Sequence, residues 1–177
     1  MRKLNVLEMN RISVDEFKKS KKNPLVVVLD NVRSMYNVGS VFRTADAFRI
    51  EAIYLCGITS CPPHPEIHKT ALGAEDAVDW VYCKNAIEAV KTLQQQDYEV
   101  LAIEQVEGST LLQDFVLEGG KKYAIVLGNE VKGVSQDVVD CCDGCLEIPQ
   151  FGTKHSLNVS TTAGIVMWEI TSKKLMK

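Results

Sequence analysis

The sequence predicts an α/β fold, with a mostly parallel sheet and helices on both faces. Two observations support this class. Short apolar runs bounded by turn residues recur along the chain, and helix-patterned segments lie between them. Strands and helices that alternate in this way form a parallel sheet covered on both sides. At 177 residues, the chain is long enough for one domain with a substantial core.

The predicted strands are short apolar runs, as buried parallel strands tend to be. They cover residues 25–29, 52–56, 100–103, 124–127 and 145–148. The predicted helices have apolar residues spaced three and four apart, and Asn85 and Ser135 are candidate N-caps for two of them. These helices cover residues 41–48, 85–96, 135–139 and 159–175.

Two segments fall outside the alternation. Residues 1–23 form a predicted N-terminal arm, in which Ser13 caps a short helix and a lysine-rich run, 18–22, precedes Pro24. A solvated linker and a contact with an RNA backbone explain these lysines equally well. The loop 57–67 is the longest stretch without a pattern, and such loops are either functional or simple surface connections. The main domain is predicted to cover residues 24–177.

Composition predicts a soluble globular protein. Hydrophobic residues make up 46% of the chain and charged residues 24%, and no apolar run approaches the roughly 18 residues of a spanning helix. The polar N-terminus lacks the apolar segment of a secretion signal, so we expect a cytoplasmic protein. The net charge of −3 gives no global basic signature. A nucleic-acid partner would therefore require local positive charge, or charge pooled by dimerization.

Six cysteines occur in the sequence, three of them as Cys141, Cys142 and Cys145. The histidines lie elsewhere, and a zinc site needs four well-placed ligands. We therefore expect no metal site, and reduced thiols that pack as small apolar side chains.

Three polar, glycine-containing loops follow predicted strands, and ligands of α/β sheets bind beyond the carboxyl ends of the strands. In the loop 30–45, Asn37 or Ser40 could cap a helix, and Gly39 could let the backbone approach a ligand. Arg43 would then lie in the first helical turn, where a cation is disfavored, which indicates a functional role. The alternative is a surface arginine paired with Asp46 or Asp30.

The second loop, 127–135, contains Gly128 for close backbone contact and Glu130 as a carboxylate. It matches neither of the common phosphate-binding patterns, so a generic connection explains it as well. In the third, 148–168, Ile148 and Leu157 could flank an adenine-like ring, while Ser156 and Asn158 could supply polar contacts. A plain helix N-cap is the alternative for these two polar residues.

Together, the segments NVGSVFRTA, LGNEVKGVS and IPQFGTKHSLNVSTTAG resemble, in order and spacing, the three motifs of the SpoU (TrmH-like) RNA ribose 2′-O-methyltransferases of the SPOUT superfamily. The resemblance extends from residue 25 to about residue 175. It implies an α/β fold with a C-terminal trefoil knot, S-adenosyl-L-methionine as the cofactor, and a homodimer in which each site is completed across the interface. Knots are rare, and no periodicity in the sequence predicts one.

The resemblance also assigns roles to individual residues. Arg43 matches the essential arginine proposed to activate the ribose 2′-hydroxyl, Asn37 belongs to the same motif, Glu130 matches the second motif's acid, and Ser156 and Asn158 match the polar pair of the third. By analogy, Ile103, Leu127, Gly128, Ile148, Ser156 and Leu157 hold the cofactor, and Arg33, Ser40, His68 and Lys69 contact RNA. Glu104 could also reach the cofactor, and a structural helix start explains His68 and Lys69 equally well.

The leading hypothesis is therefore an S-adenosylmethionine-dependent RNA 2′-O-methyltransferase, with tRNA preferred over rRNA as the substrate. The sulfonium methyl group is already electrophilic, so the enzyme must mainly align the 2′-oxygen and remove a proton. Arginine is a poor base, because its pKa lies above about 12, so Arg43 orients and activates with help from neighboring groups. The alternatives are an RNA-binding module that has lost catalysis and an ordinary nucleotide-binding α/β domain. The arm is short compared with the extensions of larger relatives, which leaves the RNA substrate open.

Overall fold

A computed structural model describes residues 1–5 and 7–175 of the chain. Within these residues, seven strands form one sheet in the order β3-β2-β1-β6-β4-β7-β5, and every neighboring pair is parallel. The strands are β1 (Asn23–Asp30), β2 (Ile50–Cys56), β3 (Asp79–Cys83), β4 (Tyr98–Ile103), β5 (Thr110–Leu111), β6 (Lys122–Leu127) and β7 (Gly144–Glu147). The predicted α/β class is confirmed.

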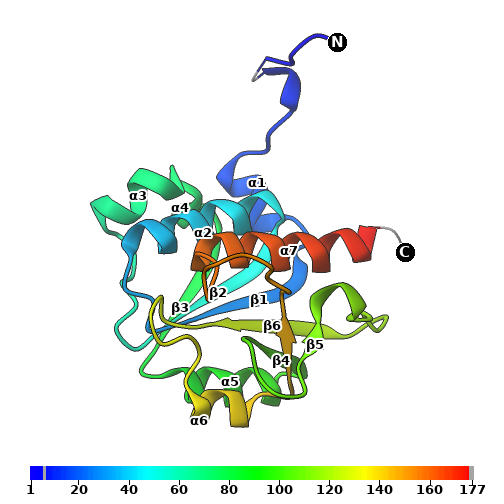
Figure 1. Cartoon of the computed structure of the whole chain (residues 1–177). Helices are drawn as coiled ribbons and strands as arrows, with labels where there is room; N and C mark the ends of the chain where they lie inside the picture. Colours follow the sequence, from blue (N-terminus) through cyan, green and yellow to red (C-terminus); the bar gives the residue numbers. More distant parts are fainter. Residues whose placement is uncertain (6, 176–177) are drawn as a thin grey trace.

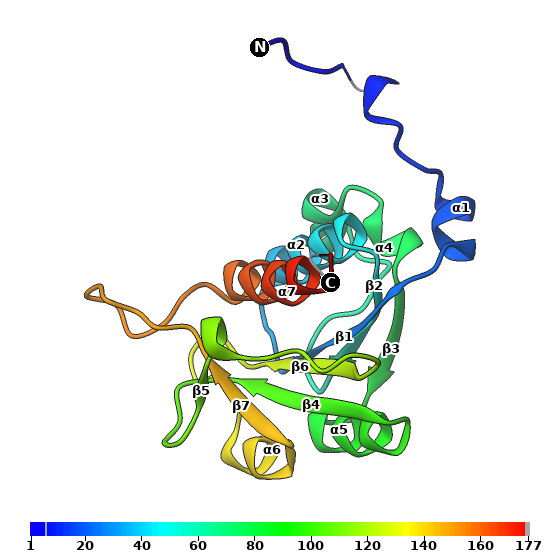
Figure 2. The same cartoon turned by 90° about the vertical axis from the view of Figure 1, so that its right-hand side faces the viewer.

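Helices cover both faces of the sheet (Figure 1). The α-helices are α1 (Val14–Lys19), α2 (Met35–Ala47), α3 (Pro65–Ala71), α4 (Ala74–Ala77), α5 (Ala86–Gln95), α6 (Gln136–Cys141) and α7 (Val159–Leu175), and the 3-10 helices are η1 (Leu7–Met9) and η2 (Leu112–Asp114). α2 and α7 lie side by side on one face, with α3 and α4 packed against α2, and α5 and α6 cover the other face (Figures 1 and 2).

The core divides into two layers because side chains of a strand alternate between the faces of a sheet. In β1, Leu25, Val27 and Leu29 point to the α2 and α7 side. Val26 and Val28 point to the α5 and α6 side. A strand buried on both faces reads as a continuous apolar run, which is why β1 could be predicted from its sequence.

All five predicted strands are present, and two others were missed. β3 is an edge strand in which Val81 is 44% exposed and Tyr82 54% exposed, so it does not form a buried apolar run. β5 has two residues and pairs only with β7. Short, exposed strands lack the signal that identified the central ones.

α2 begins earlier than the sequence analysis predicted. Its N-cap is Ser34, whose side chain accepts a hydrogen bond from the Asn37 backbone N–H, so neither Asn37 nor Ser40 is the cap. Arg43 therefore lies in the third turn rather than the first. Arg43 is thus not at the positive end of the helix, and the functional role inferred from that position is not supported by it.

The N-terminal arm has two parts. Ser13 and Glu16 form a reciprocal capping box at the start of α1, and Phe17 anchors that helix with 3% exposure in the core beside α4. Residues 1–5 and η1 extend away from the rest of the chain (Figure 2). Lys18 pairs with Asp79, and Lys22 donates to backbone carbonyls, so two of the four lysines have contacts within the chain. The boundary at residues 23 and 24, like the trefoil knot, stays a prediction.

Candidate active site

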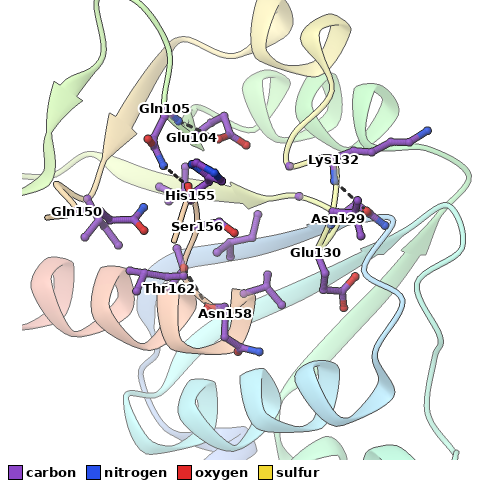
Figure 3. Close-up of a pocket in the computed structure, with 18 residues that line it drawn as sticks. Glu104, Gln105, Asn129, Glu130, Lys132, Gln150, His155, Ser156, Asn158 and Thr162 are labelled. Atoms are coloured by element: carbon purple, nitrogen blue, oxygen red, sulfur yellow. Dashed lines mark hydrogen bonds between the residues drawn. The ribbon is translucent and has the colours of Figure 1, made fainter. Parts of the chain in front are cut away.

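A pocket of about 460 Å³ lies beyond the carboxyl ends of β4, β6 and β7 (Figure 3). Three loops form it, namely the residues after β4, the β6–α6 connection and the segment between β7 and α7. These loops converge because parallel strands all end at the same edge of the sheet. The volume falls within the range of about 300–1,000 Å³ that is typical of small-molecule sites.

The structure places all six predicted cofactor residues in the wall of this pocket. They are Ile103, Leu127, Gly128, Ile148, Ser156 and Leu157. Ile103 and Leu127 are buried at the ends of their strands, whereas Leu157 is 38% exposed. The pocket thus has an apolar wall and, at Ser156 and Asn158, a polar side chain on each side of Leu157. Their role in binding a cofactor stays a prediction.

A chain of hydrogen bonds connects the three motifs at the mouth of the pocket. Asn158 Nδ2 donates to Asn37 Oδ1 over 3.1 Å, and Asn37 Nδ2 donates to Glu130 Oε1 over 3.1 Å. Asn158 also caps α7, because its Oδ1 accepts from the Ser160 and Thr161 backbone N–H groups. The structure therefore brings Asn37, Glu130 and Asn158 together, and the N-cap reading of Asn158 is correct as well.

Glu130 holds the start of α2. Its carboxylate accepts from the backbone N–H groups of Arg33 and Ser34 at 3.0 and 2.8 Å. A negative charge is favorable where a helix begins, because free N–H groups converge there. Burial alone would raise the pKa of Glu130, but the backbone hydrogen bonds from Arg33 and Ser34, together with the Asn37 amide, hold it below its ordinary value. Glu130 is therefore an anion at neutral pH.

The β6–α6 loop is shaped by contacts within the chain. Asn129 Oδ1 accepts from the Val131 and Lys132 backbone N–H groups, and its Nδ2 donates to the Asn31 carbonyl. A Cβ at Gly128 would lie 2.0 Å from the Gly133 carbonyl carbon. Gly128 is thus required by the turn itself, and its expected contact with a cofactor stays a prediction.

Glu104 has a structural role in the same region. Its Oε2 accepts from the Val134 backbone N–H at 3.0 Å, and its Oε1 accepts from Gln105 N–H at 2.9 Å. A Cβ at Gly133, where φ is +67°, would lie 2.0 Å from Glu104 Oε2. The Glu104 carboxylate fixes the loop that carries Glu130, although Glu104 also lines the pocket.

Gly39 faces α3 rather than the expected ligand. A Cβ there would lie 2.2 Å from both the Ile67 carbonyl oxygen and Thr70 Oγ1. The missing side chain lets α3 approach α2 closely, and it does not open α2 to a ligand. α2 and α3 can therefore pack closely at this position.

Arg43 is separate from this cluster. It is exposed on α2, it is absent from the pocket wall, and among the described residues it has neither an ion pair nor a side-chain hydrogen bond. The alternative pairing with Asp46 or Asp30 is therefore not formed. Burial raises the pKa of Asp46, and the nearby charge of Arg11 partly offsets this.

The four predicted RNA contacts lie on α2, α3 and the loop before α2. Arg33 and Lys69 are exposed, but Lys69 Nζ already contacts Glu66 at 2.6 Å. His68 Nδ1 lies 2.6 Å from Glu75 Oε1, whose side chain is only 7% exposed. Ser40 Oγ donates to the Tyr36 carbonyl. Their contacts with RNA stay predictions.

Sequence reasoning missed several pocket residues. Gln105 connects two walls, because its Nε2 donates to the His155 carbonyl at 2.9 Å. The others are Asn129, Val131, Lys132, Gly133, Gln150, His155, Val159 and Thr162. Most lie within the loops that were identified, so the signal was their proximity to motif residues.

No metal cluster occurs in the described ranges 1–5 and 7–175, where no three His, Cys, Asp or Glu side chains are grouped to hold an ion. The six cysteines are free thiols, and only Cys56 is fully buried. The other five are half-buried and pack against the core clusters, so the expectation that the thiols pack as small apolar side chains is confirmed. None of the described helices has the length and apolar character needed to cross a membrane.

Comparison with known proteins identifies the family. Residues 24–168 match the model of the SpoU rRNA Methylase family. A 23S rRNA (guanosine-2′-O-)-methyltransferase from Pasteurella multocida is 31% identical over 95% of this chain and 68% of its own length. The crystal structure of an AdoMet-bound rRNA methyltransferase from Sinorhizobium meliloti aligns with a TM-score of 0.79 and 25% identity, over 88% of this chain and 59% of that one.

The fold is also shared with a TrmH/SpoU tRNA modifying enzyme from A. aeolicus. The TM-score is 0.80 at 23% identity, over 97% of this chain and 86% of that one. The family model covers most of the chain, and the resemblance of the three motifs is confirmed. The chain belongs to the SpoU family of S-adenosylmethionine-dependent RNA ribose 2′-O-methyltransferases.

Proposed function

We propose that this protein transfers a methyl group from S-adenosylmethionine to a ribose 2′-hydroxyl of RNA, with the pocket beyond β4, β6 and β7 as the cofactor site. The hydrogen-bonded chain from Asn158 through Asn37 to Glu130 carries the proposal. This chain of hydrogen bonds joins all three motifs at the mouth of the pocket. A generic nucleotide-binding domain would not require such a connection.

The pocket fits the cofactor by its chemistry. Ile103, Leu127, Ile148 and Leu157 offer apolar contacts for an adenine ring, and polar groups of the surrounding loops can hold the ribose and amino-acid parts. When bound, S-adenosylmethionine supplies an electrophilic methyl group on a sulfonium sulfur. The residues of this chain then have to orient the RNA hydroxyl and accept or pass on its proton.

Different polar residues of the site position the helices, bind the substrate hydroxyl and activate it. Glu130 fixes the first turn of α2, and Asn37 transmits that position to Asn158 at the start of α7. Ser156, which is exposed in the pocket wall, is available to bind the substrate hydroxyl. Arg43 orients and activates the 2′-hydroxyl, with a neighboring group or an RNA phosphate as the proton acceptor, because its own pKa is too high for a base.

The position of Arg43 supports a homodimer. Its side chain lies outside the pocket on the exposed surface of α2. Trp168, 54% exposed, and Ile165, 38% exposed, lie on the neighboring α7. An apolar surface beside an unpaired arginine suits an isologous contact between two copies, in which one copy completes the site of the other.

The proposal also concerns which class of RNA, tRNA or rRNA, is the substrate. The substrate expected from the sequence is tRNA, and this preference stays a prediction. The relative from Pasteurella multocida is named for a guanosine of 23S rRNA, so rRNA is the competing substrate. We place the reaction in the cytoplasm, where both RNAs occur.

The test uses RNA isolated from cells with and without this gene, and both the tRNA and rRNA pools are mapped for ribose methylation by mass spectrometry. We expect one 2′-O-methyl nucleotide to disappear from one pool and to be restored in vitro by the purified protein. Arg43→Ala should abolish transfer while cofactor binding by calorimetry persists. Transfer by the Arg43→Ala variant would contradict the role of Arg43, and an absence of cofactor binding by the wild type would indicate an RNA-binding module without catalysis.

A further inference from the structure

Tyr36, Ser40 and Arg43 form a line along the outer surface of α2. Residues four and seven positions apart lie on the same face of a helix, and Tyr36 and Arg43 are two turns, or roughly 10 Å, apart along its axis. Tyr36 is 48% exposed, and Arg43 is also exposed. Asn37, the next residue along the chain, turns instead toward Glu130 and Asn158. The tyrosine therefore lies beside the catalytic cluster and in line with the catalytic arginine.

Contacts with α3 hold Tyr36 in place. Its carbonyl oxygen accepts from two hydroxyls, Ser40 Oγ at 2.8 Å and Thr70 Oγ1 at 3.0 Å. Its side chain lies near the Glu66 carboxylate, whose pKa is lowered first by Lys69, bonded to it at 2.6 Å, and also by Tyr36. The Thr70 contact exists because Gly39 has no side chain to keep α3 away. The backbone of Tyr36 is thus fixed against α3, and its large aromatic ring is left half-exposed.

We propose that the ring of Tyr36 is a stacking platform for an unpaired base of the RNA substrate, at the methylated nucleotide or its immediate neighbor. This inference rests on the proposed function. RNA sites that are recognized in single strands or loops are commonly bound by bases stacked on aromatic side chains. A tyrosine that is already fixed loses little conformational freedom when a base stacks on it. Tyr36 and Arg43 lie on the same face of α2, so one RNA strand bound along this face can reach both side chains.

The charges around the ring also suit RNA. Lys69 lies near the Tyr36 side chain. The pKa of Lys69 is raised, first by its hydrogen bond with Glu66 and also by Tyr36. A cation next to the platform can neutralize a phosphate of the stacked nucleotide. A tyrosine with a purely structural role would not need a ring that is 48% exposed.

The experiment compares aromatic and non-aromatic replacements in the full chain. Tyr36→Leu keeps an apolar side chain of similar bulk, and Tyr36→Phe keeps the ring but removes the hydroxyl. The probes are the tRNA and rRNA fractions from cells that lack the gene, with labeled S-adenosylmethionine as methyl donor. We expect Tyr36→Leu to raise KM for the RNA about tenfold, within the range of one lost stacked base, and Tyr36→Phe to stay within about threefold of the wild type.

Two readouts separate stacking from a structural role. Cofactor affinity and melting temperature should be the same in both variants as in the wild type. The slope of RNA affinity against salt should also be unchanged in Tyr36→Leu, because stacking releases no counterions. Tyr36→Trp, a second aromatic variant, should keep the low KM, and Tyr36→Gln should behave like Tyr36→Leu if the leucine variant folds poorly.

An unchanged KM in Tyr36→Leu and Tyr36→Gln, or an equal rise in Tyr36→Leu and Tyr36→Phe, would overturn the inference. Either result, in a preparation whose wild type transfers methyl groups and whose Arg43→Ala variant does not, leaves the proposed function standing. A wild type without transfer activity in both RNA fractions contradicts the proposed function itself.

Discussion

The Asn158 side-chain amide donates a 3.1 Å hydrogen bond to Asn37 Oδ1 across 121 positions of sequence. This bond joins the start of α7 to the first turn of α2. It also fixes the orientation of the Asn37 amide, because Asn37 must accept from Asn158 and donate to Glu130 at the same time. If the Asn37 amide flipped, its NH2 group would face a donor and its oxygen would face a carboxylate.

Asn158→Asp should separate the two roles of Asn158. Aspartate is as good an N-cap as asparagine, so α7 should stay capped, whereas the donor to Asn37 is lost and a second carboxylate faces Asn37 Oδ1. We expect methyl transfer to fall by on the order of 10²-fold with little change in the free energy of unfolding, whereas Asn158→Ala should also lose about 1 kcal/mol of stability. Steady-state kinetics and urea unfolding measure the two effects.

The matched control for that comparison is Asn85→Ala. Asn85 caps α5 through the Glu88 backbone N–H, on the face of the sheet opposite α2 and α7. We expect a similar loss of stability from this variant with normal kcat and KM. Full activity in Asn158→Asp would show that the Asn158–Asn37 bond is dispensable for transfer.

Glu130→Gln should make the stability of the protein less dependent on pH in the acid range. The pKa of Glu130 is lower in the folded chain than its ordinary value of 4.5, so its charge stabilizes the fold above that pH, and this contribution is lost as pH falls through the lowered pKa. The wild type should therefore be more stable than Glu130→Gln at pH 7, and the difference should shrink as pH falls below about 4.5. Urea unfolding across that range tests this, and a constant difference would contradict it.

The central fold could be predicted because its strands are buried on both faces. Continuous apolar runs such as β1 and β6 then give a signal that partly exposed strands such as β3 cannot give. The start of α2 was mispredicted for a related reason. Tyr36, Asn37 and Ser40 are polar residues in the first turns of this helix, and they read as a loop although they bind one another, α3 and Glu130.

The candidate site shows the same division. The pocket loops and the Asn37–Glu130–Asn158 cluster could be predicted, because the three motifs are recognized by residue types at fixed spacings along the chain. The roles of the glycines could not be predicted. Gly39 and Gly128 avoid backbone atoms of segments that are distant or folded back in space, and only the structure shows these contacts. Gln105 was missed because its contact with the His155 carbonyl depends on how two loops meet.

Gly39→Ala should destabilize the protein. The added methyl group would lie 2.2 Å from the Ile67 carbonyl oxygen, so α3 would have to move, and overpacking of this kind costs about 1–3 kcal/mol. Gly164→Ala in α7 is the matched control, since its nearest neighbor would be Thr44 Cγ2 at 4.0 Å. Alanine is the better helix former, so this variant should gain about 0.5–1 kcal/mol. Equal unfolding free energies for the two variants would contradict the close α2–α3 packing.

Leu157→Ala should weaken cofactor binding without unfolding the chain. Leu157 lines the pocket but is 38% exposed, so truncation removes a contact for the adenine ring and little of the core. The loss of roughly 1–1.5 kcal/mol of apolar contact corresponds to a rise of about tenfold in Kd for S-adenosylmethionine, measured by calorimetry. Leu111→Ala is the control, because Leu111 is 37% exposed on β5 and is absent from the pocket wall, so its Kd should equal that of the wild type. Equal affinities in the two variants would place the adenine ring away from Leu157, and the adenosine would then have to contact Ile103 and Leu127 at the carboxyl ends of β4 and β6.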